Sequence, residues 1–244
     1  MHTANIWNKL YLYGQKIVIL LLACFFLSAH LHAQRRVGMN IPNYDNKKYS
    51  YGFLIGLHST SFKLRYSDEF ISNDFDTLHS ILPQRSPGFS LGFIVNRGLN
   101  EFFDVRILPK VAFYEHDLEY NFTDESQINQ LKESTVVEFP LMLKYKSTRR
   151  KNSRMYMVGG VKPAYSASGR TDLDSGNESI NIQRFNISTD FGFGFDMYFP
   201  LFKFSPEVRF SKGMSNMLTD KVNIYSEGIS RLSTNTINFY LLFQ

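Results

Sequence analysis

The chain has a single cysteine among its 244 residues, only a small surplus of positive charge, and no apolar run of transmembrane-helix length. One cysteine excludes a disulfide scaffold. The net charge of +5, from 27 basic and 22 acidic residues, is too small to suggest a nucleic-acid partner. A polytopic helical membrane protein needs repeated runs of about 20 apolar residues, so that class is excluded too.

Aromatic residues, by contrast, are plentiful, with 23 Phe and 14 Tyr. This content is too high for a disordered chain. Hydrophobic residues make up 43% of the sequence, yet the mean hydropathy is only −0.22. Apolar and polar residues must therefore be finely interleaved.

The N-terminus has the order of a secretory signal peptide. Lys9 and Lys16 precede an apolar run at 17–27, and small residues follow it. We expect cleavage after Ala33, which makes residues 1–33 the signal peptide. Cys24 lies within that run and offers an alternative, because 21–24 fits a bacterial lipoprotein cleavage box. The run continues past Cys24, however, which favours the signal peptide and leaves the mature chain without a thiol.

Strict alternation of apolar with small or polar residues is the main structural signal of the remaining chain, and it is typical of two-faced strands. It is clearest at 191–198 and 202–210, where every second residue is large and apolar. Six further segments follow the rule less strictly. The eight expected strands are 49–66, 88–97, 101–116, 135–146, 154–166, 184–199, 201–212 and 231–244.

Two folds fit eight such strands, a soluble sandwich and a membrane barrel. Three features favour the barrel: the apolar face is crowded with Phe and Leu, charges of both signs recur on the other face, and long connections alternate with short ones. Outer-membrane barrels have long extracellular loops and short periplasmic turns. The sequence therefore predicts an all-β fold, an eight-stranded antiparallel transmembrane β-barrel over 49–244. Residues 34–48 would be a periplasmic N-terminal extension, and the location would be the outer membrane.

Four prolines conflict with this prediction, because proline removes a ladder donor and is normally confined to strand edges or bulges. We expect bulges at these positions, or strand ends that project beyond the membrane. The four are Pro109, Pro140, Pro163 and Pro206.

An eight-stranded barrel is narrow and filled by side chains, so a wide pore is not expected. Inward charges must pair, since an isolated buried charge is costly. We expect the acids Asp104, Glu138 and Glu207 to pair with bases among Arg106, Lys144 and Arg209. The candidate interior network is Asp104, Arg106, Lys110, Glu138, Lys144, Glu207 and Arg209. It would serve as a polar plug or, alternatively, as a proton or ion pathway.

Motifs of catalysis are missing: the sequence contains no HExxH, GxSxG or phosphate-binding glycine loop. Three histidines follow the expected cleavage site, and no spacing pairs any of them with a serine and a carboxylate. We therefore expect no enzymatic activity, no cofactor and no metal site. Outer-membrane lipids and, during insertion, the barrel assembly machinery are the expected general partners.

The extension contains Asn40-Ile41-Pro42-Asn43-Tyr44-Asp45, and Tyr51-Gly52-Phe53-Leu54-Ile55-Gly56 follows in the first expected strand. This block is the most specific part of a resemblance to the PorT family, called SprT in gliding bacteria. Weaker matches lie at 138–146, 154–163 and 202–210. Three of the four in-strand prolines, Pro140, Pro163 and Pro206, fall in these blocks and so look like a family feature.

The resemblance implies an outer-membrane component needed for type IX secretion, which exports proteins with C-terminal sorting domains and supports gliding in motile species. Other secretion components would then be partners, contacted through a periplasmic segment. The candidate contact residues are Arg35, Arg36, Pro42, Tyr44 and Asp45. Two alternatives remain: a small porin- or adhesin-type barrel that acts through its extracellular loops, and a lipid-modifying barrel enzyme.

Overall fold

The computed structural model describes residues 38–67, 78–122, 127–167, 183–218 and 229–244. The expected signal peptide, Cys24, Arg35 and Arg36 lie outside these ranges. No helix in the described part of the chain is long and apolar enough to cross a membrane. One 3-10 helix, η2 (Pro42–Asn46), precedes the strands. The strands are β1 (Tyr49–Tyr66), β2 (Leu78–Pro83), β3 (Ser86–Gly98), β4 (Phe103–Ile107), β5 (Lys110–Phe122), β6 (Gln127–Glu138), β7 (Leu141–Lys146), β8 (Ser153–Ser166), β9 (Phe185–Tyr198), β10 (Lys203–Gly213) and β11 (Ile229–Phe243).

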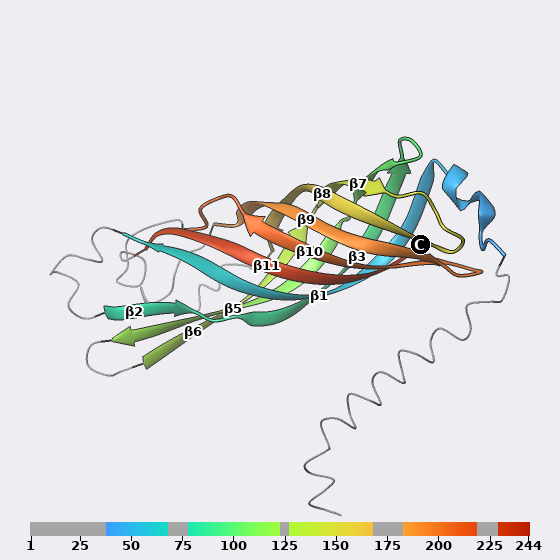
Figure 1. Ribbon diagram of the computed structural model, residues 1–244. Coiled ribbons are helices and arrows are strands. Elements are labelled where there is room, and N and C mark those ends of the chain that lie inside the picture. Colours follow the sequence, from blue (N-terminus) through green and yellow to red (C-terminus); the bar gives the residue numbers. More distant parts are fainter. Residues whose placement is uncertain (1–37, 68–77, 123–126, 168–182, 219–228) are drawn as a thin grey trace, which may run out of the picture. The chain divides into compact units, whose positions relative to one another are not determined.

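These strands form a closed antiparallel ring (Figure 1). β1 pairs with β3 on one side and with β11 on the other. From β11 the pairing continues through β10, β9 and β8. β8 then pairs with both β6 and β7. β6 pairs with β5, and β7 pairs with β4. Both β4 and β5 pair with β3, which closes the ring. Since β4 with β5 and β6 with β7 each occupy one position in the wall, the ring has the eight expected strands.

The four prolines are accommodated without bulges, which corrects our expectation. Three of them, Pro109, Pro140 and Pro163, lie on neighbouring wall strands. Their carbonyls accept the amide protons of Phe93, Leu108 and Phe139 at N···O distances of 2.9, 3.1 and 3.0 Å. The wall keeps its register across them, because Ile107 faces Leu141 on one side of the interruption and Lys110 faces Glu138 on the other.

Pro206 lies within β10 opposite Leu241, and the register of β10 with β9 is likewise continuous around it. The two register shifts in the described pairings fall elsewhere, at Arg65/Tyr66 and at Leu78/Ser80. The prolines therefore interrupt single donors of the ladder, and the neighbouring strands keep their alignment.

The two faces of the wall are arranged in the reverse of a soluble protein. Along β9, Phe191, Phe193 and Phe195 are exposed, whereas Asp196 is fully buried. The same inversion holds on β3, where Phe93 is 70% exposed. Exposed aromatic side chains around a closed ring suit a lipid environment. The arrangement excludes the sandwich alternative, whose apolar face would be the core.

Two of the four long connections contain more regular structure than expected. β2 lies within 67–87, where a loop was expected, and pairs with the outer part of β5. Likewise, β5 and β6 extend into 117–134 as a hairpin. Most of the other two long connections falls outside the described residues.

The short turns β3–β4, β7–β8 and β9–β10 lie at one end of the ring, together with the described N-terminal segment and the C-terminus. By the topology of outer-membrane barrels, this end is periplasmic.

Candidate functional site

The interior of the ring is filled by ion pairs, arranged in three groups along its axis. The groups arise because alternate residues of each strand face inward, so one strand contributes an inward side chain about every 7 Å along its length. Within the described residues, eight cations and five carboxylates have less than 9% of their surface exposed. They are Arg106, Lys110, Lys144, Lys146, Arg154, Lys162, Lys203 and Arg209, with Asp104, Glu138, Asp190, Asp196 and Glu207.

The central group is built around Glu207 of β10. Its carboxylate accepts a hydrogen bond from Arg106 Nη1 of β4 at 3.0 Å and another from Arg209 Nε of β10. The hydroxyl of Tyr156 donates to the same carboxylate at 2.7 Å. All three charged side chains are at most 1% exposed. One carboxylate therefore neutralises two guanidinium groups that come from opposite sides of the ring.

A second group surrounds Glu138, toward the extracellular end. Lys110 Nζ lies 2.6 Å from one carboxylate oxygen, and Lys162 Nζ lies 3.2 Å from the other. Tyr114 donates a hydrogen bond to Glu138 at 2.7 Å, and Lys110 donates one to the Tyr240 hydroxyl at 2.6 Å. The group links β5, β6, β8 and β11 across the interior.

The third group lies toward the periplasmic end. Lys144 and Arg154 both contact Asp196, at 2.7 and 3.0 Å. Asp104 pairs with Lys146 at 2.6 Å. Here two carboxylates hold three cations.

The structure therefore places all seven residues of the candidate network inside the ring, but with some partners other than those expected. Arg106 and Arg209 do meet Glu207. Lys144 instead meets Asp196, and Asp104 meets Lys146. Glu138 pairs with Lys110 and Lys162, and with no base of the expected partner set. The sequence analysis missed six buried charges, although all of them occupy the inward parity of strands that it had identified. They are Lys146, Arg154, Lys162, Asp190, Asp196 and Lys203.

Glycines on β9 provide the space that the central group needs. A Cβ atom at Gly194 would lie 2.5 Å from the Tyr156 ring, and one at Gly192 would lie 2.8 Å from Arg209 Cγ. Both glycines alternate with the outward-facing Phe residues of this strand. Their missing side chains therefore let Tyr156 and Arg209 cross the narrow interior.

Aromatic rings surround the two inward histidines. His58 lies 4.3 Å from the Tyr114 ring, and His116 lies 4.3 Å from the Phe62 ring, both measured between centroids. The described residues contain no cluster of three or more His, Cys, Asp or Glu side chains that could hold a metal ion. The interior chemistry is therefore mainly that of paired charges and aromatic packing, with Asp190 as a buried carboxylate that has no hydrogen-bond partner within the described ranges.

The N-terminal segment is seated on the periplasmic end of the ring. We call residues 39–47 the N-terminal clasp. Tyr44 of η2 is 8% exposed and packs edge-on against Tyr198, with ring centroids 5.5 Å apart. Lys203 Nζ lies 4.6 Å from the centre of the Tyr44 ring, a cation–π distance. The clasp thus fills the mouth of the barrel with an aromatic side chain.

Ion pairs and backbone contacts fasten the clasp. Asp45 pairs with Arg154 at 2.9 Å and with Arg149 at 3.4 Å. Arg149, from the β7–β8 turn, also donates to the carbonyls of Asn40 and Ile41 and stacks on Tyr198. Ile41 has a φ of 45°, which is an unusual conformation for a β-branched residue. The contacts of Arg149 and of the Tyr44 amide with the Ile41 carbonyl hold it there.

Of the candidate partner-contact residues in the described chain, Tyr44 and Asp45 therefore contact the barrel itself. Pro42 is exposed. The basic turn beside the clasp contributes two further exposed residues, Arg150 and Lys151.

A family model places this architecture among known proteins. The model described as "Outer membrane protein beta-barrel domain" matches residues 32–219, which is more than half of the chain. The chain belongs to this family, and it is an outer-membrane β-barrel protein of the small eight-stranded type.

Solved structures of small outer-membrane barrels are similar to it at low sequence identity. OprG from Pseudomonas aeruginosa aligns with a TM-score of 0.43 and 14% identity over 80% of this chain and 95% of its own. Neisserial surface protein A aligns with a TM-score of 0.40 and 12% identity over 80% and 98%. Ail, the attachment invasion locus protein of Yersinia pestis, gives 0.35 and 12% over 81% and 98%. No curated protein matches the sequence.

Proposed function

We propose that this barrel is an accessory or assembly factor of the type IX secretion system, required for the export of proteins with C-terminal sorting domains and, in motile species, for gliding. The observation that carries the proposal is the N-terminal clasp. The sequence block with the most specific resemblance to the PorT family, residues 40–45, forms η2 and its flanking turn at the periplasmic mouth. A segment that only connected a signal peptide to a barrel would not need a buried tyrosine and a doubly paired aspartate.

The interior supports a scaffolding role over a transport role. Buried ion pairs hold the lumen at three levels, and the clasp covers one end. The buried cations outnumber the buried carboxylates by eight to five in the described residues, so the lumen would repel a permeating cation. A polar plug explains this arrangement better than the alternative of a proton or ion pathway.

The working surface in this proposal is the periplasmic end of the barrel. Since Tyr44 and Asp45 are used to seat the clasp, a secretion component would contact the groups that the clasp presents outward. These are Pro42, Asn43 and Lys47 of the clasp, the adjacent Lys48, and Arg150 and Lys151 of the neighbouring turn. The outer-membrane lipids surround the wall, and the barrel assembly machinery would act during insertion.

Deletion of the gene in its native host tests the proposal. We expect sorting-domain cargo to disappear from the medium and to accumulate in the periplasm, as measured by quantitative proteomics of both fractions. A strain that carries Tyr44→Ala with Asp45→Ala should show the same defect at normal barrel abundance. The matched control is Leu201→Ala with Glu101→Ala, two exposed positions in the turns at the same end and outside the clasp. Normal export after clean deletion would refute the secretion role.

A small porin- or adhesin-type barrel is the second candidate, favoured by the hairpin of β5 and β6, which extends beyond the pairing of β5 with β3. This candidate predicts that shortening the hairpin at 119–131 removes function, whereas removal of 34–48 does not. The secretion proposal predicts the reverse. In either case the barrel would be non-catalytic, and lipid A mass spectra should be identical in the deletion and parent strains.

A further inference from the structure

A cluster of cations lies on the outer wall of the barrel, near its extracellular end. Lys63 and Arg65 of β1, Lys212 of β10 and Arg231 of β11 line one hollow of about 490 Å³. The strand register explains why they gather: Arg65 faces Arg231, Lys63 faces Ser233, and both Ser61 and Lys212 face Asn235. Four positive side chains from three adjacent strands thus share one surface.

Nothing in the described part of the chain neutralises this cluster. The described residues that line the hollow include no acidic side chain. None of the four cations belongs to an ion pair of the described residues, although Arg231 donates a hydrogen bond to the Met214 carbonyl at 2.6 Å. In the lumen of the same barrel, by contrast, nearly every cation has a carboxylate nearby. The outer cluster therefore has its positive charge available for a ligand.

The position of the cluster along the wall points to a lipid. The nearest outward apolar residues on the same strands are Leu57, Phe210 and Ile237, which are 62, 49 and 40% exposed. On β1 and β11 the polar residues Ser59, Ser61 and Asn235 lie between these apolar residues and the cations. Lys212 follows Phe210 by two residues, a rise of about 7 Å. Lys212 therefore stands immediately above the apolar band, and Lys63, Arg65 and Arg231 follow beyond a short polar stretch, so the cluster lies at the level of the headgroups of the outer leaflet.

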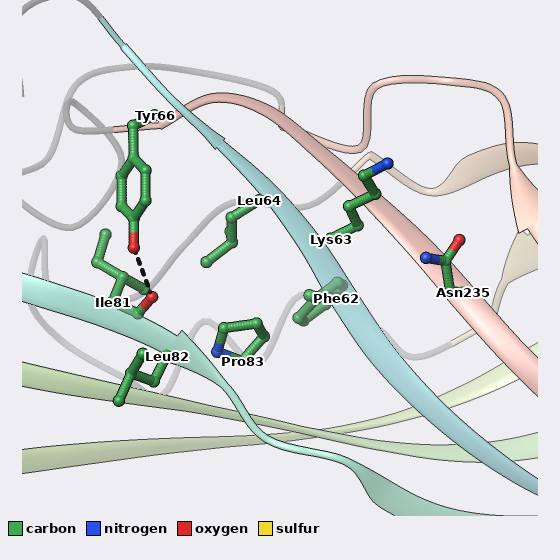
Figure 2. Close-up of a pocket in the computed structure, with 8 residues that line it drawn as sticks. All are labelled: Phe62, Lys63, Leu64, Tyr66, Ile81, Leu82, Pro83 and Asn235. Atoms are coloured by element: carbon green, nitrogen blue, oxygen red, sulfur yellow. Dashed lines mark hydrogen bonds between the residues drawn. The ribbon is translucent and has the colours of Figure 1, made fainter.

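Lys63 separates the basic hollow from an apolar crevice on the other side of β1. β3 pairs with β1 only as far as Thr60, so a gap opens between the outer part of β1 and β2. Figure 2 shows Phe62 and Leu64 pointing into this crevice toward Ile81 and Pro83, while Lys63 points away from it toward β11. The hydroxyl of Tyr66 bridges the crevice by donating to the Ile81 carbonyl at 2.9 Å. The side chain of Lys63 is thus directed to the basic side.

We propose that this hollow binds the phosphorylated headgroup of an outer-leaflet glycolipid. Phosphate groups attract clustered Lys and Arg side chains, and each such contact near a membrane surface adds to the affinity. The acyl chains of the same lipid would lie along Phe210 and Ile237. Lipid binding at this hollow requires only the outer-membrane location and the positions of the four cations, so it does not depend on the secretion role.

Native mass spectrometry of the refolded mature barrel tests the proposal. The barrel in detergent is titrated with bisphosphorylated lipid A, and the bound fraction is measured. The variant Lys63→Gln/Arg65→Gln/Lys212→Gln/Arg231→Gln should bind about 10- to 100-fold more weakly, because it loses four headgroup contacts. The matched control removes four exposed cations at the periplasmic end, Lys48, Arg97, Arg150 and Lys151, and should change binding by less than about twofold.

Two further arms identify the ligand. Enzymatically dephosphorylated lipid A should bind equally to the wild-type barrel and to the four-site Lys63/Arg65/Lys212/Arg231 variant, here called the rim variant. Millimolar inorganic phosphate should leave lipid binding largely intact, because a free ion lacks the acyl chains. Heat-modifiable gel mobility shows that every variant is folded. Equal lipid binding by the rim and control variants would overturn the proposal, as would complete displacement by inorganic phosphate or equally tight binding of a phosphorylated polysaccharide without acyl chains.

Discussion

Neutralising Glu207 should be among the most damaging single substitutions in the barrel. Glu207→Gln keeps the size of the side chain but leaves Arg106 and Arg209 buried without a counter-charge. Breaking a buried ion pair by removing one partner costs about 3–5 kcal/mol. Here one carboxylate serves two guanidinium groups, and Tyr156 also loses its charged acceptor. We therefore expect a loss of about 3–5 kcal/mol in the free energy of unfolding.

The assay is urea unfolding of the mature barrel in lipid vesicles, followed by far-UV circular dichroism and by heat-modifiable gel mobility. Glu101→Gln, an exposed carboxylate of the β3–β4 turn, is the matched control and should change stability by less than about 0.5 kcal/mol. The triple variant Glu207→Leu/Arg106→Met/Arg209→Met removes both charges together with their partner. Since apolar replacement of a whole buried charge group is often neutral, the triple variant should be more stable than Glu207→Gln alone.

Two results would refute this reasoning. A Glu207→Gln barrel within about 1 kcal/mol of wild type would mean that water reaches the central group and screens it. A triple variant less stable than the single one would mean that the side chains act through packing and not through charge. Either result would also weaken the description of the lumen as a plug.

Three further outcomes follow from the same geometry. Tyr44→Ala should release the clasp, and limited proteolysis of folded barrel in vesicles should then cleave within 39–47 at least about tenfold faster, an amount that a loss of about 1.4 kcal/mol would produce. Gly194→Val should abolish or strongly slow folding because its Cβ would meet the Tyr156 ring at 2.5 Å, whereas Gly159→Val, where nothing lies within 4 Å, should fold normally in the same gel assay. Phe93→Lys should destabilise the barrel in vesicles by about 2–4 kcal/mol if the outer face contacts lipid near the bilayer midplane; no change in the urea midpoint would count against that placement.

The wall of the barrel could be predicted from the sequence because it follows a two-residue period. β1 begins and ends where the alternation does, at 49 and 66, and the remaining wall strands lie within a few residues of their expected bounds, apart from β5 and β6, which extend into the connection between them. The in-strand prolines indicated an interrupted hydrogen-bond ladder, but the sequence did not show how the strands accommodate them. Their carbonyls still accept hydrogen bonds, and only the geometry of three neighbouring strands shows that the register survives.

The pairing inside the lumen could not be predicted, because it depends on how far each strand is staggered and on which side chains reach across. Asp104 lies directly opposite Lys144 in the register of β4 and β7, yet its carboxylate contacts Lys146. Lys144 reaches Asp196 on β9 instead. Long, flexible side chains choose partners by position in three dimensions, whereas a sequence pattern specifies only which face each residue occupies.

The conformation of the clasp could not be predicted from the sequence for a different reason. The clasp is one turn of 3-10 helix with no repeating apolar position, and its conformation depends on Arg149, which lies more than 100 residues away in the chain. Residue types such as Pro42 and Asp45 are common in loops without any such role. A resemblance to a family located this segment, and the structure shows the contacts that give it a shape.

Lumen and clasp substitutions should therefore be interpreted differently in any test of secretion. A variant of Glu207 or Glu138 weakens the barrel itself, so a secretion defect would follow from lower abundance in the membrane. A variant of Tyr44 leaves the eight-stranded ring and its three ion-pair groups intact, so the same defect would indicate a lost contact at the periplasmic face. Comparing cargo export at equal amounts of folded barrel separates the two. If only the lumen variants impaired export, the clasp would be a structural seal, and the secretion components would have to contact the barrel elsewhere.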